Sequence, residues 1–219
     1  MPLSVSESIA SDLLAIGAVF LRPNEPFTWA SGIKSPIYCD HRLTLSEPDT
    51  RGRIERALAD RVRQAFPECE ALFGTATAGI PHAAIVAYMM GLPMGYVRGS
   101  GKDHGLKNRV EGKLLPGWKV VVVEDLVSTG GSALDAVDAL RSAGADALGV
   151  VCIFTYNMGR GIDAFRQSGL RLESLTDFDT LADIAARTGA VDPADLPRLR
   201  AFRDNPDDTS WIITKPEVV

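Results

Sequence analysis

Hydrophobic residues recur along the chain at two different spacings, and together the spacings predict alternating helices and strands. Between Ile54 and Phe66 every fourth residue is apolar and charged residues stand between, which predicts a helix over residues 49–66. The continuous run Val120–Val123 instead predicts a strand over residues 119–123 that is buried on both faces. The same criteria predict a helix that begins at the Ser4–Glu7 capping box and ends near Gly17. They predict further helices over residues 80–90, 132–143 and 180–187 and after Pro193. Strands are predicted over residues 71–74, 94–97 and 148–154.

The order of these elements predicts an α/β fold with a central parallel sheet flanked by helices. A strand, a helix and a second strand follow one another between residues 119 and 154, at the lengths of a parallel crossover unit. Residues 18–45 are rich in aromatic residues, proline and glycine, and we expect short strands and turns that form a hood. We therefore expect one domain over residues 1–219, with an N-terminal helix and hood (1–48), a core (49–160) and a C-terminal strand with helices (161–219).

Composition and charge argue against several classes of protein. With 219 residues, of which 46% are hydrophobic, the chain can bury one complete core. Its formal net charge of −5 argues against general nucleic-acid binding, which depends on neutralising phosphates with basic residues. The first residues lack the pattern of a signal peptide, and no apolar run approaches the roughly 20 residues of a membrane span. The three cysteines lack metal-like spacing, so we expect reduced thiols in a cytoplasmic protein without membrane or nucleic-acid partners.

The strongest chemical signal follows the valine run. Two adjacent carboxylates, Glu124 and Asp125, stand at the expected end of the strand, and the turn Ser128–Ser132 leads into the next helix. Backbone N–H groups at a helix start bind anions, and glycines let such a turn curl around a phosphate. The carboxylates can accept hydrogen bonds from neutral hydroxyls beside it. An ordinary capped turn needs only one acid or serine, so the pattern favours a site for a ribose 5-phosphate.

Two further segments support an anion site. Residues 74–79 form a second turn of small residues between a strand and a helix, which is a weak signal alone but places more N–H donors at the same sheet edge. Residues 99–117 form a long polar loop that starts next to Arg98 and carries Lys102 and His104 among glycines. Taken alone, a solvated loop is the more common explanation; beside an anion cradle, we expect a flexible lid that closes over a polyanion.

Other common catalytic patterns are missing from the sequence. The His, Cys and Asp residues lack zinc-like spacing, and there is no Gly-x-Ser-x-Gly nucleophile elbow. We assign no role to His41 or His82, and expect His82 to cap or pack against a helix start.

Three segments give nearly the whole chain a resemblance to the type I phosphoribosyltransferases. Val120–Ser132 is similar to that family's motif for phosphoribosyl pyrophosphate (PRPP), and Arg98 with Lys102–His104 is similar to its catalytic loop. Phe27–Tyr38 resembles the N-terminal segment of the members that act on orotate. The sequence Thr-Ala-Thr-Ala-Gly at residues 75–79 resembles the branch typical of Gram-positive bacteria.

The resemblance implies a glycosyl transfer: ribose 5-phosphate moves from PRPP to orotate, forming orotidine 5′-phosphate and pyrophosphate in de novo pyrimidine (UMP) biosynthesis. It implies catalytic roles for Lys102, His104, Glu124 and Asp125. The implied PRPP-binding residues are Arg98, Lys102, His104, Glu124, Asp125, Leu126, Val127, Ser128, Thr129, Gly130, Gly131 and Ser132, and the implied orotate-binding residues are Ser128, Lys34, Tyr38 and Arg160. Mg²⁺ is the implied cofactor, carried by PRPP, with Asp125 as the one candidate protein ligand. A homodimer that shares the loop across its interface is implied as well.

Two alternative functions remain open at this point. A purine-salvage phosphoribosyltransferase would share the ribose-phosphate site but should lack the segment Phe27–Tyr38. A non-catalytic regulator that senses PRPP should have a basic face and a degraded loop, whereas this chain is acidic and keeps Lys102 and His104. The cation that meets the orotate carboxylate is also open, because some family members have lysine at the positions of Ala30 and Ala78.

Overall fold

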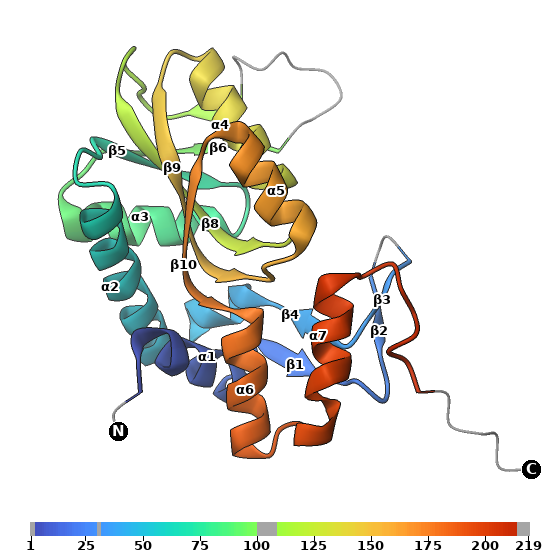
Figure 1. Cartoon of the computed structure of the whole chain (residues 1–219). Coiled ribbons are helices and arrows are strands. Elements are labelled where there is room, and N and C mark those ends of the chain that lie inside the picture. The colour runs from blue at the N-terminus through green and yellow to red at the C-terminus, as the bar shows by residue number, and fades with distance from the viewer. Residues whose placement is uncertain (1–2, 30–31, 100–108, 214–219) are drawn as a thin grey trace, which may run out of the picture.

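A six-stranded sheet forms the centre of the computed structural model, which describes residues 3–29, 32–99 and 109–213 (Figure 1). The strand order is β10-β9-β8-β5-β6-β7, in which β7 is antiparallel to β6 and every other pair is parallel. The strands are β5 (Ala71–Thr75), β6 (Met94–Val97), β7 (Val110–Glu111), β8 (Lys119–Val127), β9 (Asp146–Thr155) and β10 (Arg171–Asp177). The predicted α/β fold with a mostly parallel sheet is confirmed.

Helices cover both faces of this sheet. One face packs against α2 (Pro48–Ala65) and α3 (Gly79–Met90), and the other against α4 (Gly131–Ser142) and α5 (Gly159–Ser168). The valine run of β8 supplies both cores, because successive side chains of a strand point to opposite faces. Val121 and Val123 lie in the core on the α2 and α3 side, and the two other valines lie in the core on the α4 side.

The N-terminal segment packs next to the C-terminal helices rather than on the sheet alone. It contains α1 (Val5–Ala15), the paired strands β1 (Val19–Leu21) and β4 (Ile37–Cys39), the paired strands β2 (Phe27–Thr28) and β3 (Lys34–Ser35), and the 3-10 helix η1 (His41–Ser46). The C-terminal part adds α6 (Phe178–Thr188), the 3-10 helix η3 (Pro193–Asp195) and α7 (Leu196–Asp204). Figure 1 shows β1 to β4 beside α6 and α7. Trp29 of the hood contacts Phe202 of α7 edge to face, with ring centres 5.7 Å apart.

Most predicted elements are present, and the differences concern their ends. The predicted capping box is formed: the Ser4 hydroxyl accepts from the Glu7 backbone N–H (3.2 Å) and the Glu7 carboxylate accepts from that of Ser4 (2.9 Å). The strand expected over residues 119–123 extends to Val127, because its pairing with β9 continues to that residue. The expectation that Glu124 and Asp125 follow the strand was therefore wrong; they lie within β8.

Short pairings and irregular periodicity account for the remaining differences. Residues 110 and 111, predicted as loop, pair with β6 as β7, and the bounds of α5 were not predicted.

Two predicted site residues, Lys102 and His104, lie outside the described residues. Within the described ranges, no helix is both long and apolar enough to span a membrane.

Candidate active site

The turn between β8 and α4 surrounds a cavity of about 200 Å³ that is lined by Leu126–Ala133, and we call this turn the cradle. Gly130 adopts a left-handed conformation (φ +82°), which favours glycine, and α4 begins at the next residue without a side-chain cap. The first N–H groups of α4 therefore lack both intrahelical partners and a capping oxygen. This geometry, together with the positive end of the helix dipole, suits a phosphate. All the predicted turn residues from Ser128 to Ser132 line the cavity.

The start of α5 supports this turn from below. A Cβ atom on Gly161 would lie 2.5 Å from the carbonyl oxygen of Ser128, so the helix approaches the turn as closely as a residue without a side chain permits. The ring of Phe165 similarly lies against Gly130, where a Cβ atom would meet it at 2.9 Å. No local sequence pattern predicts this contact between α5 and the turn.

The two acids of β8 have different partners. Glu124 is 5% exposed; its carboxylate accepts hydrogen bonds from the Ser132 hydroxyl (2.7 Å) and from the backbone N–H of Asp125 (3.1 Å). The side chain of Asp125 is 21% exposed. Burial, and secondarily the neighbouring Glu124, raise the pKa of Asp125 to about 8. The pair therefore carries less negative charge than two free carboxylates and is suited to hydrogen-bond neutral hydroxyls.

His41, to which the sequence analysis assigned no role, contacts Asp125. Its Nδ1 lies 3.2 Å from the backbone carbonyl oxygen of Asp125 and 3.9 Å from the carboxylate. The ring is 2% exposed, and burial lowers the pKa of His41 to about 4, so the imidazole is neutral at pH 7. Because 84 positions separate the two residues, no local pattern could have revealed this contact.

The turn between β5 and α3 lies at the same sheet edge. β5 and β8 are parallel neighbours with Gly74 opposite Val123, and the Thr75 hydroxyl donates to the carbonyl oxygen of Val123 (3.3 Å). A Cβ atom on Gly79 would lie 2.4 Å from that same oxygen, so only glycine lets α3 start here. The predicted placement of both small-residue turns at one edge is confirmed.

A smaller cavity of about 90 Å³ adjoins the cradle. Its lining residues come from the cradle, the hood and two C-terminal segments: Thr129, Trp29, Ile33, Met158, Gly159, Arg160, Asp204, Asn205 and Pro206. Arg160 forms an ion pair with Asp207 (2.5 Å). Lys34 donates to the Thr28 hydroxyl (2.7 Å) and Tyr38 packs against a neighbouring hood aromatic ring; neither lines this cavity. Of the four predicted orotate ligands, Ser128 lines the turn and Arg160 lines the adjoining cavity, whereas Lys34 and Tyr38 line neither of these two cavities.

The predicted loop over residues 99–117 is firmly held at Arg98, where it begins, and at Arg109. Arg98 pairs with Glu111 (3.2 Å), and the Arg109 Nε–H donates to the carbonyl oxygen of Arg98 (2.9 Å). The guanidinium of Arg109 also makes two hydrogen bonds to Asp135 of α4 (2.9 and 2.5 Å) and is almost completely buried. These contacts fix where the chain leaves and rejoins the sheet.

The carboxylate oxygens beside the cradle are too few to bind a metal ion unless a substrate supplies the other ligands. Among the described residues, no group of three or more His, Cys, Asp and Glu side chains is arranged to hold a metal. Glu124 is engaged by Ser132, which leaves the Asp125 carboxyl as the accessible oxygen donor. Mg²⁺ keeps several waters and takes few protein ligands when a substrate phosphate binds it.

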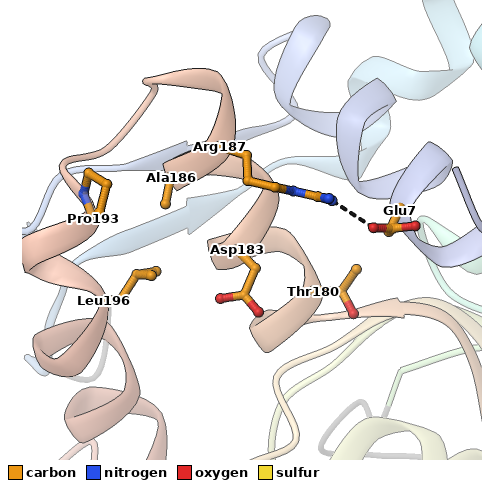
Figure 2. A pocket seen from close by; sticks show the side chains of 7 residues that line it. All are labelled: Glu7, Thr180, Asp183, Ala186, Arg187, Pro193 and Leu196. Carbon is orange, nitrogen blue, oxygen red and sulfur yellow. Dashed lines mark hydrogen bonds and ion pairs between the residues drawn. The ribbon is translucent and has the colours of Figure 1, made fainter. Parts of the chain in front are cut away.

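The largest cavity described, about 580 Å³, lies elsewhere, along α6 (Figure 2). Its polar lining residues are Glu7, Arg187, Asp183 and Thr180. Arg187, the one basic residue among the lining residues, forms an ion pair with Glu7 (2.6 Å). None of its lining residues comes from the turns at the sheet edge. Volume alone therefore does not identify the reactive site.

A parallel sheet with a glycine-containing turn and an acid pair at its carboxyl edge has the geometry typical of a ligand-binding site in α/β proteins. Comparison with known families identifies the class. Residues 46–173 match the phosphoribosyl transferase domain, and this region contains the acid pair and both glycine-containing turns.

Individual relatives give a narrower identification. The chain is 53% identical to the orotate phosphoribosyltransferase of Lactococcus lactis subsp. cremoris (strain SK11), covering 93% of this chain and 97% of the relative. It is 52% identical to the orotate phosphoribosyltransferase of Bacillus subtilis (strain 168), covering 94% and 96%. The crystal structure of orotate phosphoribosyltransferase from Aeropyrum pernix superimposes with a TM-score of 0.72 at 31% identity, covering 83% and 98%. The chain belongs to the phosphoribosyltransferase family and, within it, to the orotate phosphoribosyltransferases.

Proposed function

We propose that this chain transfers ribose 5-phosphate from PRPP to orotate, giving orotidine 5′-phosphate and pyrophosphate for pyrimidine biosynthesis. The β8–α4 cradle with its adjacent acid pair carries the sugar-phosphate half of this proposal. The identity of more than half of the residues to an orotate phosphoribosyltransferase along nearly the full chain carries the orotate half.

The residues of the cradle suggest how the reaction is assisted. The N–H groups from Thr129 to Ser132 bind the 5-phosphate and fix the position of the sugar. Asp125 and Glu124 bind the ribose hydroxyls and favour the positive charge that develops at the anomeric carbon when its bond to pyrophosphate breaks. The reaction then depends on orientation and electrostatics rather than on a covalent intermediate with the protein.

Mg²⁺ is the proposed cofactor. The accessible Asp125 carboxyl, once deprotonated, would be its protein ligand, and the pyrophosphate group would supply the other charged oxygens. When bound, the ion neutralises charge on the leaving pyrophosphate.

The loop residues Lys102 and His104 are proposed to act with Arg98 on the leaving pyrophosphate. Because negative charge on that group grows in the transition state, a Lys102→Ala variant should lose kcat with little change in the KM for PRPP. Steady-state kinetics test this role, and an unchanged kcat would exclude it.

Ser128 and Arg160 are the proposed orotate ligands beside the cradle. Arg160 lies at the small cavity, and its ion pair with Asp207 is exposed, so exchange of partner for a ligand carboxylate costs little. Lys34 and Tyr38 are proposed to contact orotate from the hood.

A homodimer that shares the loop is the proposed assembly. Cytoplasm is the proposed compartment, because all three cysteines are free thiols, as in a reducing environment.

Loss of orotate absorbance in the ultraviolet tests the proposed function directly. The purified chain should consume orotate only when PRPP and Mg²⁺ are both present. Adenine, hypoxanthine and xanthine with the same donor serve as the comparison, and RNA binding at moderate salt tests a regulatory role. Use of a purine in place of orotate, or RNA binding without turnover, would reject the proposal.

A further inference from the structure

Two buried imidazole nitrogens have no hydrogen-bond partner among the described residues. They are the Nε2 atoms of His41 and His82, whose residues are 2% and 0% exposed. Buried polar atoms in folded proteins almost always have a hydrogen-bond partner, either a protein group or an ordered water. The proposed reaction uses neither of these rings.

The two histidines belong to one polar cluster that spans three elements. His82 in the first turn of α3 pairs through Nδ1 with the carboxylate of Glu55 on α2 (2.6 Å). His41 begins η1, which packs against α2, and α2 packs against α3. The two rings are within electrostatic range of each other, because a positive charge on His82 would lower the pKa of His41. On its far side, His41 reaches the backbone carbonyl oxygen of Asp125 through Nδ1 (3.2 Å).

We propose that one buried water bridges the Nε2 atoms of His41 and His82 and makes His41 a positioning residue for Asp125. The water donates one hydrogen to each Nε2 lone pair. Each ring then carries its proton on Nδ1, from which His82 donates to Glu55 and His41 donates to the Asp125 carbonyl oxygen. The chain of hydrogen bonds connects the packing of α2 and α3 to the backbone beside the acid pair.

The bridge matters because the tautomer of His41 decides whether Asp125 is held. With the proton on Nε2 instead, Nδ1 would present a lone pair to a carbonyl oxygen and the contact would be repulsive. A displaced Asp125 backbone would shift the carboxyl group that is proposed to bind the ribose hydroxyls. The functional effect of this inference therefore rests on the proposed function, whereas the water and the tautomer do not.

Kinetics of two His41 variants test the positioning role. His41→Leu removes both ring nitrogens, whereas His41→Asn keeps an amide donor near the position of Nδ1. The Leu variant should raise the KM for PRPP by about tenfold and that for orotate by less than about twofold, and the Asn variant should restore most of the loss. Ile184→Ala in α6 is the control for a general loss of stability, because Ile184 is a buried apolar residue. Equal KM values in His41→Leu and the wild type, or an Asn variant as impaired as the Leu variant, would overturn the role.

The ring nitrogens can be observed without any turnover. In ¹⁵N-labelled protein, His41 should show a protonated Nδ1 and an unprotonated Nε2 that accepts a hydrogen bond. His82→Asn keeps a donor toward Glu55 but removes Nε2, so it should shift the Nε2 signal of His41. A wild-type His41 protonated at Nε2, or a signal unmoved by His82→Asn, would overturn the bridge. If the wild type fails to consume orotate while these signals appear as expected, the proposed function fails and the bridge stands.

Discussion

The environment of Asp125 destabilises its charged form in the folded chain but suits the group for binding a ligand. Its carboxyl group is mostly buried beside a second carboxylate, which raises its pKa to about 8. Its backbone carbonyl oxygen lies 3.2 Å from the Nδ1 atom of the buried His41. Perturbed carboxyl groups of this kind are typical of functional sites, where a ligand supplies the missing partners.

Replacement of Asp125 should therefore stabilise the fold while abolishing the reaction. The raised pKa means that the folded chain holds a proton which the unfolded chain releases between about pH 4 and pH 8, so stability falls as the pH rises through this window. Asp125→Asn should remove that dependence and gain on the order of 1 kcal/mol or more over the wild type at pH 8. Its kcat/KM should fall at least about 100-fold. Urea unfolding at pH 5 and pH 8 measures the first effect, and orotate consumption the second.

The exposed Asp163 on α5 provides the matched control, because it forms a surface ion pair with Arg166. Asp163→Asn should leave both the pH dependence and the activity near those of the wild type. An Asp125→Asn protein whose stability follows the pH as the wild type does would contradict the assigned protonation.

For His41 we predict the opposite pH dependence of folding stability, at acidic pH. Burial lowers its pKa from 6.5 to about 4, so the unfolded chain takes up a proton that the folded chain resists, and stability is lost as the pH falls through this range. Between pH 7 and pH 5 the loss assigned to this residue is about 2 kcal/mol. His41→Asn should lose correspondingly less, as measured by urea unfolding at the two pH values. Parallel losses in the variant and the wild type would show that His41 does not titrate in this way.

At the scale of elements, the site depends on how closely α5 approaches the β8–α4 turn. The contact between Gly161 and the carbonyl oxygen of Ser128 leaves no room for a methyl group. The approach orients the turn whose N–H groups are proposed to bind phosphate. A helix that contributes no ligand to the cradle thus helps to determine its shape.

Gly161→Ala should weaken PRPP binding by displacing the turn. The added Cβ atom would meet the Ser128 oxygen at 2.5 Å, and backbone on both sides has to move. We expect the KM for PRPP to rise at least about tenfold and stability to fall by about 1–3 kcal/mol. Gly52→Ala in α2 is the control, since its Cβ atom would meet only the flexible end of the Arg56 side chain, at 3.4 Å. Steady-state kinetics and thermal unfolding of both variants decide; equal effects would show that the close approach is unimportant.

The sequence was sufficient to predict elements with strong periodicity but not the contacts between them. The valine run of β8 and the regular spacing in α2 predicted buried elements because burial on one or two faces leaves a direct trace in the pattern. The end of β8 was missed because pairing with β9, rather than the side chains of β8, determines where the strand stops. Likewise, the turn was predicted from the sequence of residues 128–132. The contacts of His41 with Asp125 and of Gly161 with Ser128 were not, because they join segments that are far apart in the chain.

At the scale of the whole molecule, the hood and the C-terminal helices form one wall of the site. Trp29 contacts Tyr156, which follows β9, as well as Phe202 of α7, with ring centres 5.8 and 5.7 Å apart. The small cavity beside the cradle is lined from both regions, including Ile33 of the hood. Residues from the N-terminal and the C-terminal segments therefore line the proposed base position together.

A shared active site makes a prediction about mixtures of inactive chains. If each loop serves the partner's cradle, a dimer of one Lys102→Ala chain and one Asp125→Asn chain has one site with both lesions and one site with none. Random exchange at equal concentrations makes about half of the dimers mixed, so recovered activity should approach about a quarter of the wild-type value. Orotate consumption before and after subunit exchange measures it, with mass determination in solution as the check on assembly. Recovery should be absent if the loop serves its own chain, because every site then carries one of the two lesions.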